Sequence, residues 1–178
     1  MASVPPVSVL VWAVLLRSYL VSEAIRTPRR DAKPTILRWQ DIYDRGANTT
    51  GMVMSSIRIP NAGSVHIFTY NTTEDKGISK VIQEKGIWEE DASRYMCDIL
   101  RSKDGNYLDV GANIGALTIP LVPCLKGKEV FAVEAIPRNA EHILASVLEN
   151  RYRGVVVVPS AVGSPSDPPK EVFAVEAI

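Results

Sequence analysis

The sequence has no surplus of charge of either sign. Its 178 residues contain 20 Lys and Arg and 20 Asp and Glu, so the formal net charge is zero. A nucleic-acid-binding protein usually shows a basic excess gathered on one face. We therefore expect no nucleic-acid partner, and the short basic cluster RTPRR at residues 26–30 is typical of a solvated linker.

Cysteine and histidine are also scarce, with two residues of each kind. Cys97 and Cys124 lie far apart and lack the C-x-x-C spacing of a zinc site, and one pair does not make a disulfide framework. We expect two buried free thiols, with a single disulfide as the alternative. His66 and His142 show no metal-ligand spacing. We therefore expect no metal site, and we place both histidines at surface or hydrogen-bonded positions rather than in catalysis.

The N-terminal region lacks an apolar run of membrane-spanning length. Residues 7–16 (VSVLVWAVLL) are apolar, but a helix that crosses a bilayer needs about 20 such residues. The run matches the apolar core of a signal peptide, and the small-x-small triplet at 22–24 is a candidate cleavage site. However, no Lys or Arg precedes the run, and a basic cluster follows it. We interpret residues 1–34 as a signal peptide or anchor with a basic linker, with membrane association through residues 7–21.

Two Asn-Thr-Thr triplets, which begin at Asn48 and Asn71, fit the acceptor pattern for N-glycosylation. Such triplets also occur by chance, so they add modest weight to the signal-peptide interpretation. Together these features favour entry into the secretory pathway or association with a membrane. The alternative is a cytoplasmic protein that carries an apolar N-terminus.

Residues 35–105 are predicted to form a helix, a β-hairpin and a second helix. The first helix ends at Gly46. Its apolar face contains Ile36, Trp39 and Tyr43. Two short strands within 52–70 flank a Pro-Asn-Ala-Gly turn, which is typical of a hairpin. The second helix begins at the N-cap residue Asp91 and ends at Gly105. Its apolar positions are Ala92, Tyr95, Met96 and Ile99.

From residue 106 the pattern alternates between apolar strands and helices. The strands are NYLDV (106–110), EVFAVEAI (129–136) and VVVVPSAV (155–162). Pro120 and Pro123 shorten the first connecting helix, and the second begins at Pro137, where proline is tolerated. Strands that are apolar throughout and joined by helices indicate a parallel sheet covered on both faces. The fold class is therefore α/β.

Two acidic residues stand at the carboxyl ends of neighbouring strands. Asp109 lies in LDVGANIG and Glu134 in AVEAIP. Ligands of open parallel sheets bind at this edge. Gly111 and Gly115 let a ligand approach the backbone closely, and the helix that starts near Gly115 offers free N–H groups. Because a carboxylate on the second strand can accept both hydroxyls of a ribose, this arrangement predicts a nucleoside cofactor.

The loop after the first strand argues against several cofactor classes. Its pattern D-x-G-x-x-x-G lacks the G-x-G-x-x-G spacing that holds a pyrophosphate in nicotinamide sites. Asp109 would repel a pyrophosphate but would attract the ammonium of an amino-acid group. The chain has neither the G-K-[S/T] of a P-loop nor the G-x-S-x-G of a hydrolase nucleophile. S-Adenosylmethionine fits best, because it has a ribose and an amino-acid end but no phosphate.

Three segments resemble the FkbM family of S-adenosylmethionine-dependent methyltransferases. They are YLDVGANIGALTIPLV, VFAVEAIPRNAEHILASVLEN and VVVVPSAVGS, and with the lead-in GISKVIQEKGIWEED the resemblance covers roughly residues 64–167. It implies a Rossmann-like fold that transfers a methyl group to a hydroxyl of a small molecule or a glycan. It names no catalytic base. The cofactor-binding residues that it implies are Asp109, Gly111, Ala112, Asn113 and Gly115 for the methionine half, Glu134 for the ribose, and Ala135 and Ala161 beside the adenine.

The chain departs from the family in two places. Val133-Glu134-Ala135 stands where the family usually has Phe-Glu-Pro, which keeps the acid. A fourth strand of the Lys-Ile-Asp-Val-Glu-Gly type is missing, and KEVFAVEAI from 128–136 recurs at 170–178 instead. We therefore expect a methyltransferase domain over 106–169 that is truncated after its third core strand. The alternative is a non-catalytic remnant that binds cofactor weakly or not at all.

The second copy of KEVFAVEAI is not expected to form a second cofactor site, because Glu176 has no glycine loop of its own. A parallel crossover needs a dozen or more residues, whereas only GSPSDPP separates this copy from the third strand. We expect it to pair antiparallel with the third strand or to stay unpaired. The resemblance implies that the missing fourth strand would lie beside the first, so the strand at 106–110 is expected to be an exposed edge and an aggregation hazard.

Overall fold

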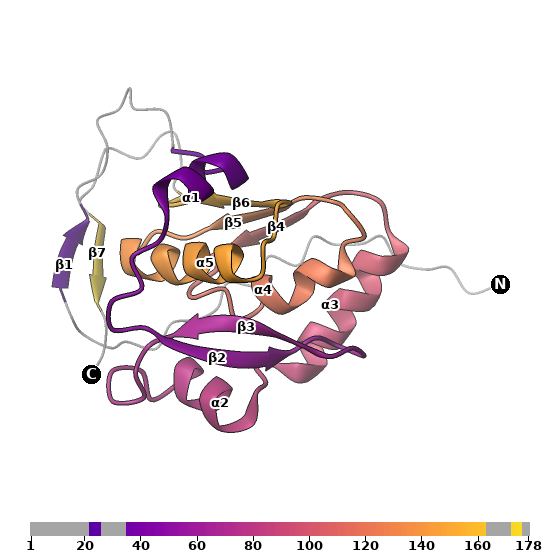
Figure 1. Cartoon of the computed structure of the whole chain (residues 1–178), viewed down its shortest axis with the longest axis horizontal. Coiled ribbons are helices and arrows are strands. Elements are labelled where there is room, and N and C mark those ends of the chain that lie inside the picture. The colour runs from indigo at the N-terminus through magenta and orange to yellow at the C-terminus, as the bar shows by residue number, and fades with distance from the viewer. Residues whose placement is uncertain (1–21, 26–34, 163–171, 176–178) are drawn as a thin grey trace.

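The computed structural model describes residues 22–25, 35–162 and 172–175. These residues form a mixed α/β fold with a three-stranded parallel sheet and an antiparallel hairpin (Figure 1), which confirms the α/β class. The elements are β1 (Ser22–Ile25), α1 (Trp39–Arg45), β2 (Val53–Arg58), β3 (Ser64–Thr69), α2 (Ile78–Lys85), α3 (Glu90–Ser102), β4 (Tyr107–Val110), α4 (Thr118–Leu121), the 3₁₀ helix η1 (Val122–Cys124), β5 (Val130–Val133), α5 (Pro137–Glu149), β6 (Val155–Val158) and β7 (Val172–Val175).

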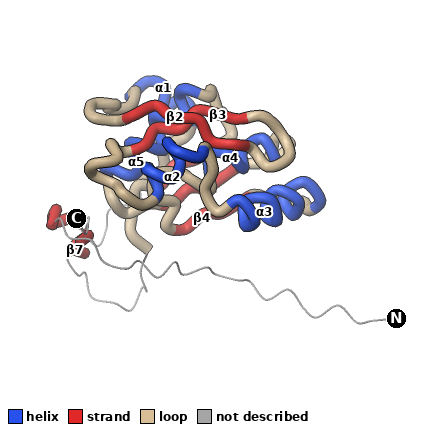
Figure 2. Tube along the Cα trace, turned by 90° about the horizontal axis from the view of Figure 1, so that it is seen from below, coloured by secondary structure: helices blue, strands red, loops and turns tan. Residues whose placement is uncertain are grey.

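The main elements stack in layers. Helix α5 contacts β6 of the parallel sheet on one side and β3 of the hairpin on the other. Helix α2 packs against both strands of the hairpin and forms the outermost layer (Figure 1). Helix α3 lies at one side of these layers, where it contacts α4 and η1 (Figure 2). The core therefore lies on both sides of α5.

The sheet has the strand order β4-β5-β6, and its parallel pairing confirms the predicted parallel sheet. Tyr107 of β4 is in register with Val130 of β5, which is in register with Val155 of β6. Both crossovers run in the same direction across the sheet. Because such crossovers are right-handed, α4 and α5 lie on the same face.

The opposite face of β4 is open, so the expectation that both faces are covered is wrong for this strand. The side chains of Leu108 and Val110 are 61% and 52% exposed, whereas Tyr107 and Asp109 on the other face are half-buried. The reason is the one-directional strand order, which places both connecting helices on one side. Strand β4 is also an edge strand of the described sheet, as predicted for residues 106–110.

The two cysteines form a disulfide, so the expectation of two free thiols is wrong. Cys97 lies in α3 and Cys124 ends η1, and the sulfurs are bonded with the Cα atoms 5.3 Å apart. Both residues are fully buried. Packing of α3 against η1 brings the two residues within the Cα separation that a disulfide requires. The bond closes a loop that contains β4 and the glycine-rich segment after it.

Helix α1 ends at Gly46 as predicted, but it buries a different face. Ile42 is fully buried and Tyr43 is exposed, whereas Ile36 is exposed and lies before the helix, which begins at Trp39. Trp39 is half-buried and packs against the core. The hairpin is confirmed, because β2 and β3 pair antiparallel around the turn at 60–63.

Helix α3 is confirmed, but its start and its buried face differ from the prediction. The N-cap residue is Glu89, with a left-handed φ of 42°, and Asp91 lies inside the first turn. The buried positions are Ser93, Cys97 and Leu100. Tyr95 and Ile99 are exposed. The disulfide fixes this orientation, because it holds the Cys97 face toward η1.

The second copy of the repeated segment pairs with β1, so neither expected arrangement is observed. Strand β7 runs antiparallel to β1, with Ser22 opposite Val175 and Ile25 opposite Val172. The outer edge of β6 is already occupied by Leu37. The N–H of Leu37 donates to Val157 O at 2.8 Å, and the N–H of Val157 donates to Leu37 O at 2.9 Å.

Several predictions lie outside the described residues. They are the apolar run at 7–21, the basic linker at 26–30, the segment at 163–171 and Glu176. Among the helices that the structure does describe, none combines the length and the apolar character needed to cross a bilayer.

Candidate cofactor site

Asp109 lies near the carboxyl end of β4, on the face of the strand that the helices cover. Its Oδ2 atom accepts a hydrogen bond from the Thr118 hydroxyl at 2.5 Å. Burial raises the pKa of this carboxyl above its usual range, and the Thr118 hydrogen bond partly opposes that rise. Asp109 is therefore a partly desolvated acid with one protein donor, which is a setting that favours a bound cation.

The glycine-rich loop at 111–115 bends through three residues with positive φ. These are Gly111 at 82°, Asn113 at 52° and Gly115 at 84°. The N–H groups of Gly111 and Ala112 both donate to Val133 O, at 2.9 and 3.0 Å, which ties the loop to the end of β5. The loop therefore folds back beside the second acidic residue.

Gly111 and Gly115 differ in the space around them. A side chain added at Gly111 would meet no atom within 4 Å, whereas one at Gly115 would come within 2.9 Å of Ile119 Cγ1. Gly111 therefore leaves an open approach to the loop backbone. Gly115 instead serves the packing of the loop against α4.

Glu134 follows β5 and is buried, with 6% of its surface exposed. Its Oε2 atom accepts from the N–H of Asn113 at 2.8 Å, and Oε1 accepts from the N–H of Ile136 at 2.8 Å. Burial raises the pKa of this carboxyl, the hydrogen bonds oppose the rise, and the charge of Asp109 adds to it. The two acids are therefore close enough to influence each other.

A relay of polar side chains supports Glu134 from the hairpin. Asn139 Nδ2 donates a long hydrogen bond of 3.5 Å to Glu134 Oε1, and the Tyr70 hydroxyl donates to Asn139 Oδ1 at 2.6 Å. The Tyr70 ring packs beside the His142 ring at 4.1 Å between centroids, and the Arg138 guanidinium lies 4.7 Å from its centroid. The relay links the acidic site to the hairpin layer through α5.

The structure brings together most of the predicted site residues at the carboxyl edge of β4 and β5. This group contains Asp109, Gly111, Ala112, Asn113, Gly115, Glu134 and Ala135. Ala161 follows β6 and is exposed, and no described hydrogen bond joins it to the group. Thr118, Asn139 and Tyr70 were not predicted as parts of the site. The only local signal for Asn139 was that it is a polar residue directly after Pro137-Arg138.

The residues present fit a ligand with a cationic group and vicinal hydroxyls. A carboxylate offers roughly four acceptor positions. Asp109 uses one of them for Thr118, and Glu134 uses two for short backbone contacts and one for the long contact with Asn139. Asp109 therefore has capacity for an ammonium, and Glu134 can accept ribose hydroxyls. A phosphate would meet the buried Glu134 and the half-buried Asp109 instead of a cation.

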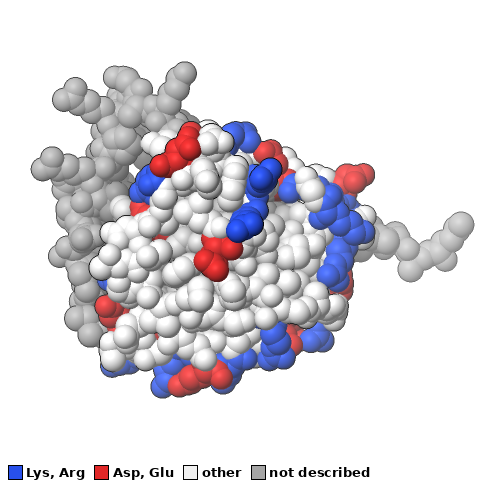
Figure 3. All heavy atoms as spheres, in the orientation of Figure 1, with Lys and Arg blue, Asp and Glu red and all other residues white. Residues whose placement is uncertain are grey.

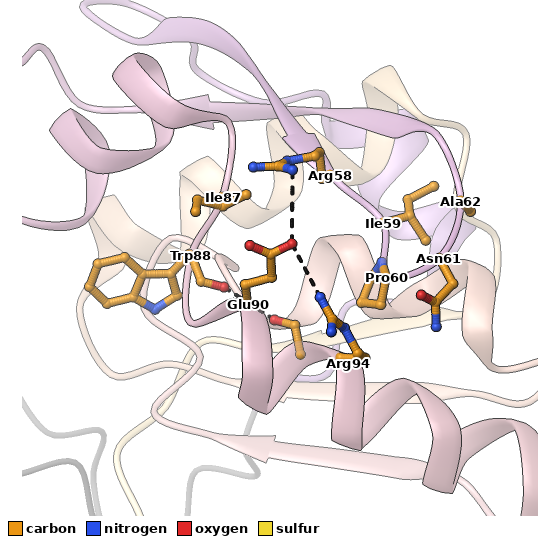
Figure 4. A pocket seen from close by; sticks show the side chains of 10 residues that line it. Arg58, Ile59, Pro60, Asn61, Ala62, Ile87, Trp88, Glu90 and Arg94 are labelled. Atoms are coloured by element: carbon orange, nitrogen blue, oxygen red, sulfur yellow. Dashed lines mark hydrogen bonds and ion pairs between the residues drawn. The ribbon is translucent and has the colours of Figure 1, made fainter.

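A cavity of about 180 Å³ lies elsewhere, between the hairpin turn and the start of α3 (Figure 4). It is lined by Arg58, Ile59, Pro60, Asn61, Ala62, Ile87, Trp88, Glu90, Ser93 and Arg94. Glu90 Oε1 lies 3.8 Å from Arg58 Nη1 and 3.5 Å from Arg94 Nη2. None of the predicted site residues lines this cavity, so we assign it no part of the cofactor site.

Many charged side chains lie around the rim of the face shown in Figure 3, and an acidic cluster with a basic cluster beside it lies near the centre of that face. Among the described residues, no group of three or more His, Cys, Asp and Glu side chains is arranged to hold a metal ion.

Comparison with known proteins gives no assignment. No family model matches the sequence, and no curated protein matches it. The FkbM resemblance therefore stays a prediction from the motifs.

Stability is expected to fall as the pH rises above about 4, the ordinary pKa of an aspartate. Burial raises the folded-state pKa of Asp109 and Glu134, so the folded protein holds their protons more tightly than the unfolded chain. The resulting stabilisation is fully present below the unfolded pKa and is lost as the pH rises through the folded pKa. Urea unfolding across this pH range measures the slope.

Asp109→Asn should reduce this pH dependence, because it removes one of the two titrating groups and keeps an oxygen for Thr118. Asp104→Asn, at an exposed acid outside the site, is the matched control and should keep the parent slope. Equal slopes for the parent chain and Asp109→Asn would show that burial of Asp109 has no energetic consequence.

Proposed function

We propose that the chain binds S-adenosylmethionine at the β4–β5 edge and transfers its methyl group to a hydroxyl oxygen, on the Rossmann-like sheet of an FkbM-type methyltransferase. The observation that carries the proposal is the pair of acids, Asp109 and Glu134, beside a loop with three positive-φ residues. The bound cofactor would supply an electrophilic methyl group on a sulfonium sulfur. The acceptor would be a small molecule or a glycan.

Asp109 would bind the ammonium of the cofactor. Its carboxyl is partly desolvated, so a nearby cation lowers its pKa and stabilises the ionised form. The Thr118 hydroxyl fixes the orientation of the carboxylate. The open space at Gly111 allows the amino-acid end to approach the loop backbone. These contacts would hold one end of the cofactor.

Glu134 would bind the ribose hydroxyls. The backbone N–H groups of Asn113 and Ile136 hold its carboxylate, and Asn139 supports it from α5. A ribose hydroxyl would replace the long Asn139 contact at little cost, because a hydrogen bond of 3.5 Å is weak. The two acids would therefore bind the two polar ends of one cofactor.

Isothermal titration of the full chain with S-adenosylmethionine tests the proposal. Hydrogen bonds to a charged group contribute about 1.5–3 kcal/mol, so Glu134→Gln and Asp109→Asn should each weaken binding about 10- to 100-fold. Asp104→Asn should bind as the parent does. Circular dichroism checks that each variant is folded.

Absence of binding by a folded parent chain would contradict the proposal, as would equal affinities for the parent and both site variants. Tighter binding of NADH than of S-adenosylmethionine would instead favour a nicotinamide site.

Cofactor binding without methyl transfer is the second candidate. The observation that favours it is that the cavity between the hairpin turn and α3 shares no residue with the acidic pair or the glycine loop. Transfer of a labelled methyl group to hydroxyl-bearing acceptors separates the two. Binding with no transfer across a glycan and small-alcohol panel would support the non-catalytic role.

A further inference from the structure

The asparagines of the two Asn-Thr-Thr triplets are both exposed, and the triplets lie in turns outside the layers of the core. Asn48 follows α1, and its Oδ1 atom accepts from the N–H of Thr50 at 3.1 Å. Asn71 follows β3, and its Oδ1 accepts from both the N–H and the hydroxyl of Thr73, at 3.0 and 2.9 Å. In each triplet the second threonine, Thr50 or Thr73, therefore donates to the oxygen of the asparagine amide.

The nitrogen of each of these amides is available. Within the described part of the chain, neither Asn48 Nδ2 nor Asn71 Nδ2 donates a hydrogen bond. Asn139 and Asn150, which lie outside any triplet, behave differently. Asn150 Nδ2 donates to His66 O and Ser146 O, both at 2.7 Å, and Asn139 Nδ2 donates to Glu134. The triplet asparagines thus carry exposed amide nitrogens that no structural contact uses.

The disulfide is independent evidence for a secretory compartment, where asparagine-linked glycosylation takes place. Disulfides form and persist in oxidising compartments and are rare in the cytosol. The Cys97–Cys124 bond lies fully inside the protein, where it joins α3 to η1. The apolar run at 7–16 matches the core of a signal peptide. A secretory compartment supplies both disulfide formation and asparagine-linked glycosylation.

We propose that Asn48 and Asn71 are N-glycosylation sites and that the chain enters the secretory pathway. The donor is an oligosaccharide linked to a polyprenyl diphosphate. The amide nitrogen Nδ2 forms a bond to the anomeric carbon of the first sugar, and the bond from that carbon to the diphosphate oxygen breaks. The polyprenyl diphosphate leaves with the bonding electrons, and the amide proton passes to a base of the transferase. This modification is independent of the proposed methyl transfer.

Expression of the full chain in cultured eukaryotic cells tests the proposal. Digestion with peptide-N-glycosidase should increase the gel mobility of the product. The enzyme converts each released asparagine to aspartate, so mass spectrometry should find aspartate at positions 48 and 71. N48Q and N71Q should each remove one of two mobility steps, and the double variant should remove both.

Matched threonine substitutions separate the acceptor pattern from the local fold. Thr50→Ala and Thr73→Ala destroy the triplets without changing the asparagines and should prevent modification. Thr49→Ala and Thr72→Ala change the middle residue of each triplet and should keep it. A full chain whose mobility is unaffected by the glycosidase would overturn the proposal. A mobility shift that survives in the N48Q/N71Q double variant would overturn the assigned positions.

Discussion

Reduction of the Cys97–Cys124 disulfide is expected to lower the free energy of unfolding by about 3.5 kcal/mol. The bond joins residues 27 positions apart, and closing a loop of this size removes conformational entropy from the unfolded chain. For a chain of this length, the loss corresponds to a fall of roughly 7 to 14 °C in the melting temperature. Thermal unfolding of the full chain with and without dithiothreitol measures it.

The Cys97→Ala/Cys124→Ala double variant is the control for this experiment. It lacks the bond in both conditions, so its melting temperature should not respond to dithiothreitol. An unchanged melting temperature for the parent chain, with loss of the bond verified by thiol labelling, would show that the packing of α3 against η1 holds without the cross-link.

Gly115→Ala should cost roughly 2 to 5 kcal/mol of stability. The φ of 84° is left-handed, and a non-glycine residue there costs about 1–2 kcal/mol. The added methyl group would also lie 2.9 Å from Ile119 Cγ1 and 3.3 Å from Ile143 Cγ1, and such overpacking typically costs about 1–3 kcal/mol. Urea unfolding gives the difference.

Gly111→Ala is the matched control, because Gly111 has a similar φ of 82° but no neighbour within 4 Å of an added side chain. Gly111→Ala should therefore lose only the stability that the left-handed backbone conformation costs, about 1–2 kcal/mol. If both variants lose the same stability, the contact of Gly115 with α4 contributes nothing and left-handed strain accounts for the whole effect.

The strands of the parallel sheet and the loop after β4 could be predicted because their signals are local. Each strand is a continuous apolar run, and the spacing of Gly111 and Gly115 directly follows Asp109. The carboxyl ends of adjacent parallel strands meet at one edge, so the approach of Asp109 to Glu134 follows from the topology. The strands and the loop can therefore each be identified from a short stretch of sequence.

The buried faces of the helices and the disulfide could not be predicted in the same way. The predicted first helix placed Ile36 and Tyr43 on its apolar face, yet α1 begins only at Trp39 and Ile42 is the residue that the core buries. Which face is buried depends on the partner that packs there. The pairing of Cys97 with Cys124 likewise depends on how α3 meets η1, a contact that no local pattern encodes.

The residues that support the two acids were missed because they come from other parts of the chain. Tyr70 ends the hairpin and reaches Asn139, which is 69 residues further along the chain. Thr118 meets Asp109 only because the loop returns along the end of β5. A polar residue without a spacing motif gives no sequence signal until the layers of the fold are known.

The bridge between Leu37 and Val157 has a consequence for assembly. Growth of a sheet into a fibril requires two free edges on every copy, so that each added strand offers the next one a template. In the part of the chain that the structure describes, Leu37 bridges the outer side of β6 at Val157, whereas no strand pairs with the outer side of β4. Association of two molecules through their β4 strands would therefore leave, at each end of the joined sheet, a β6 edge that Leu37 already bridges at Val157.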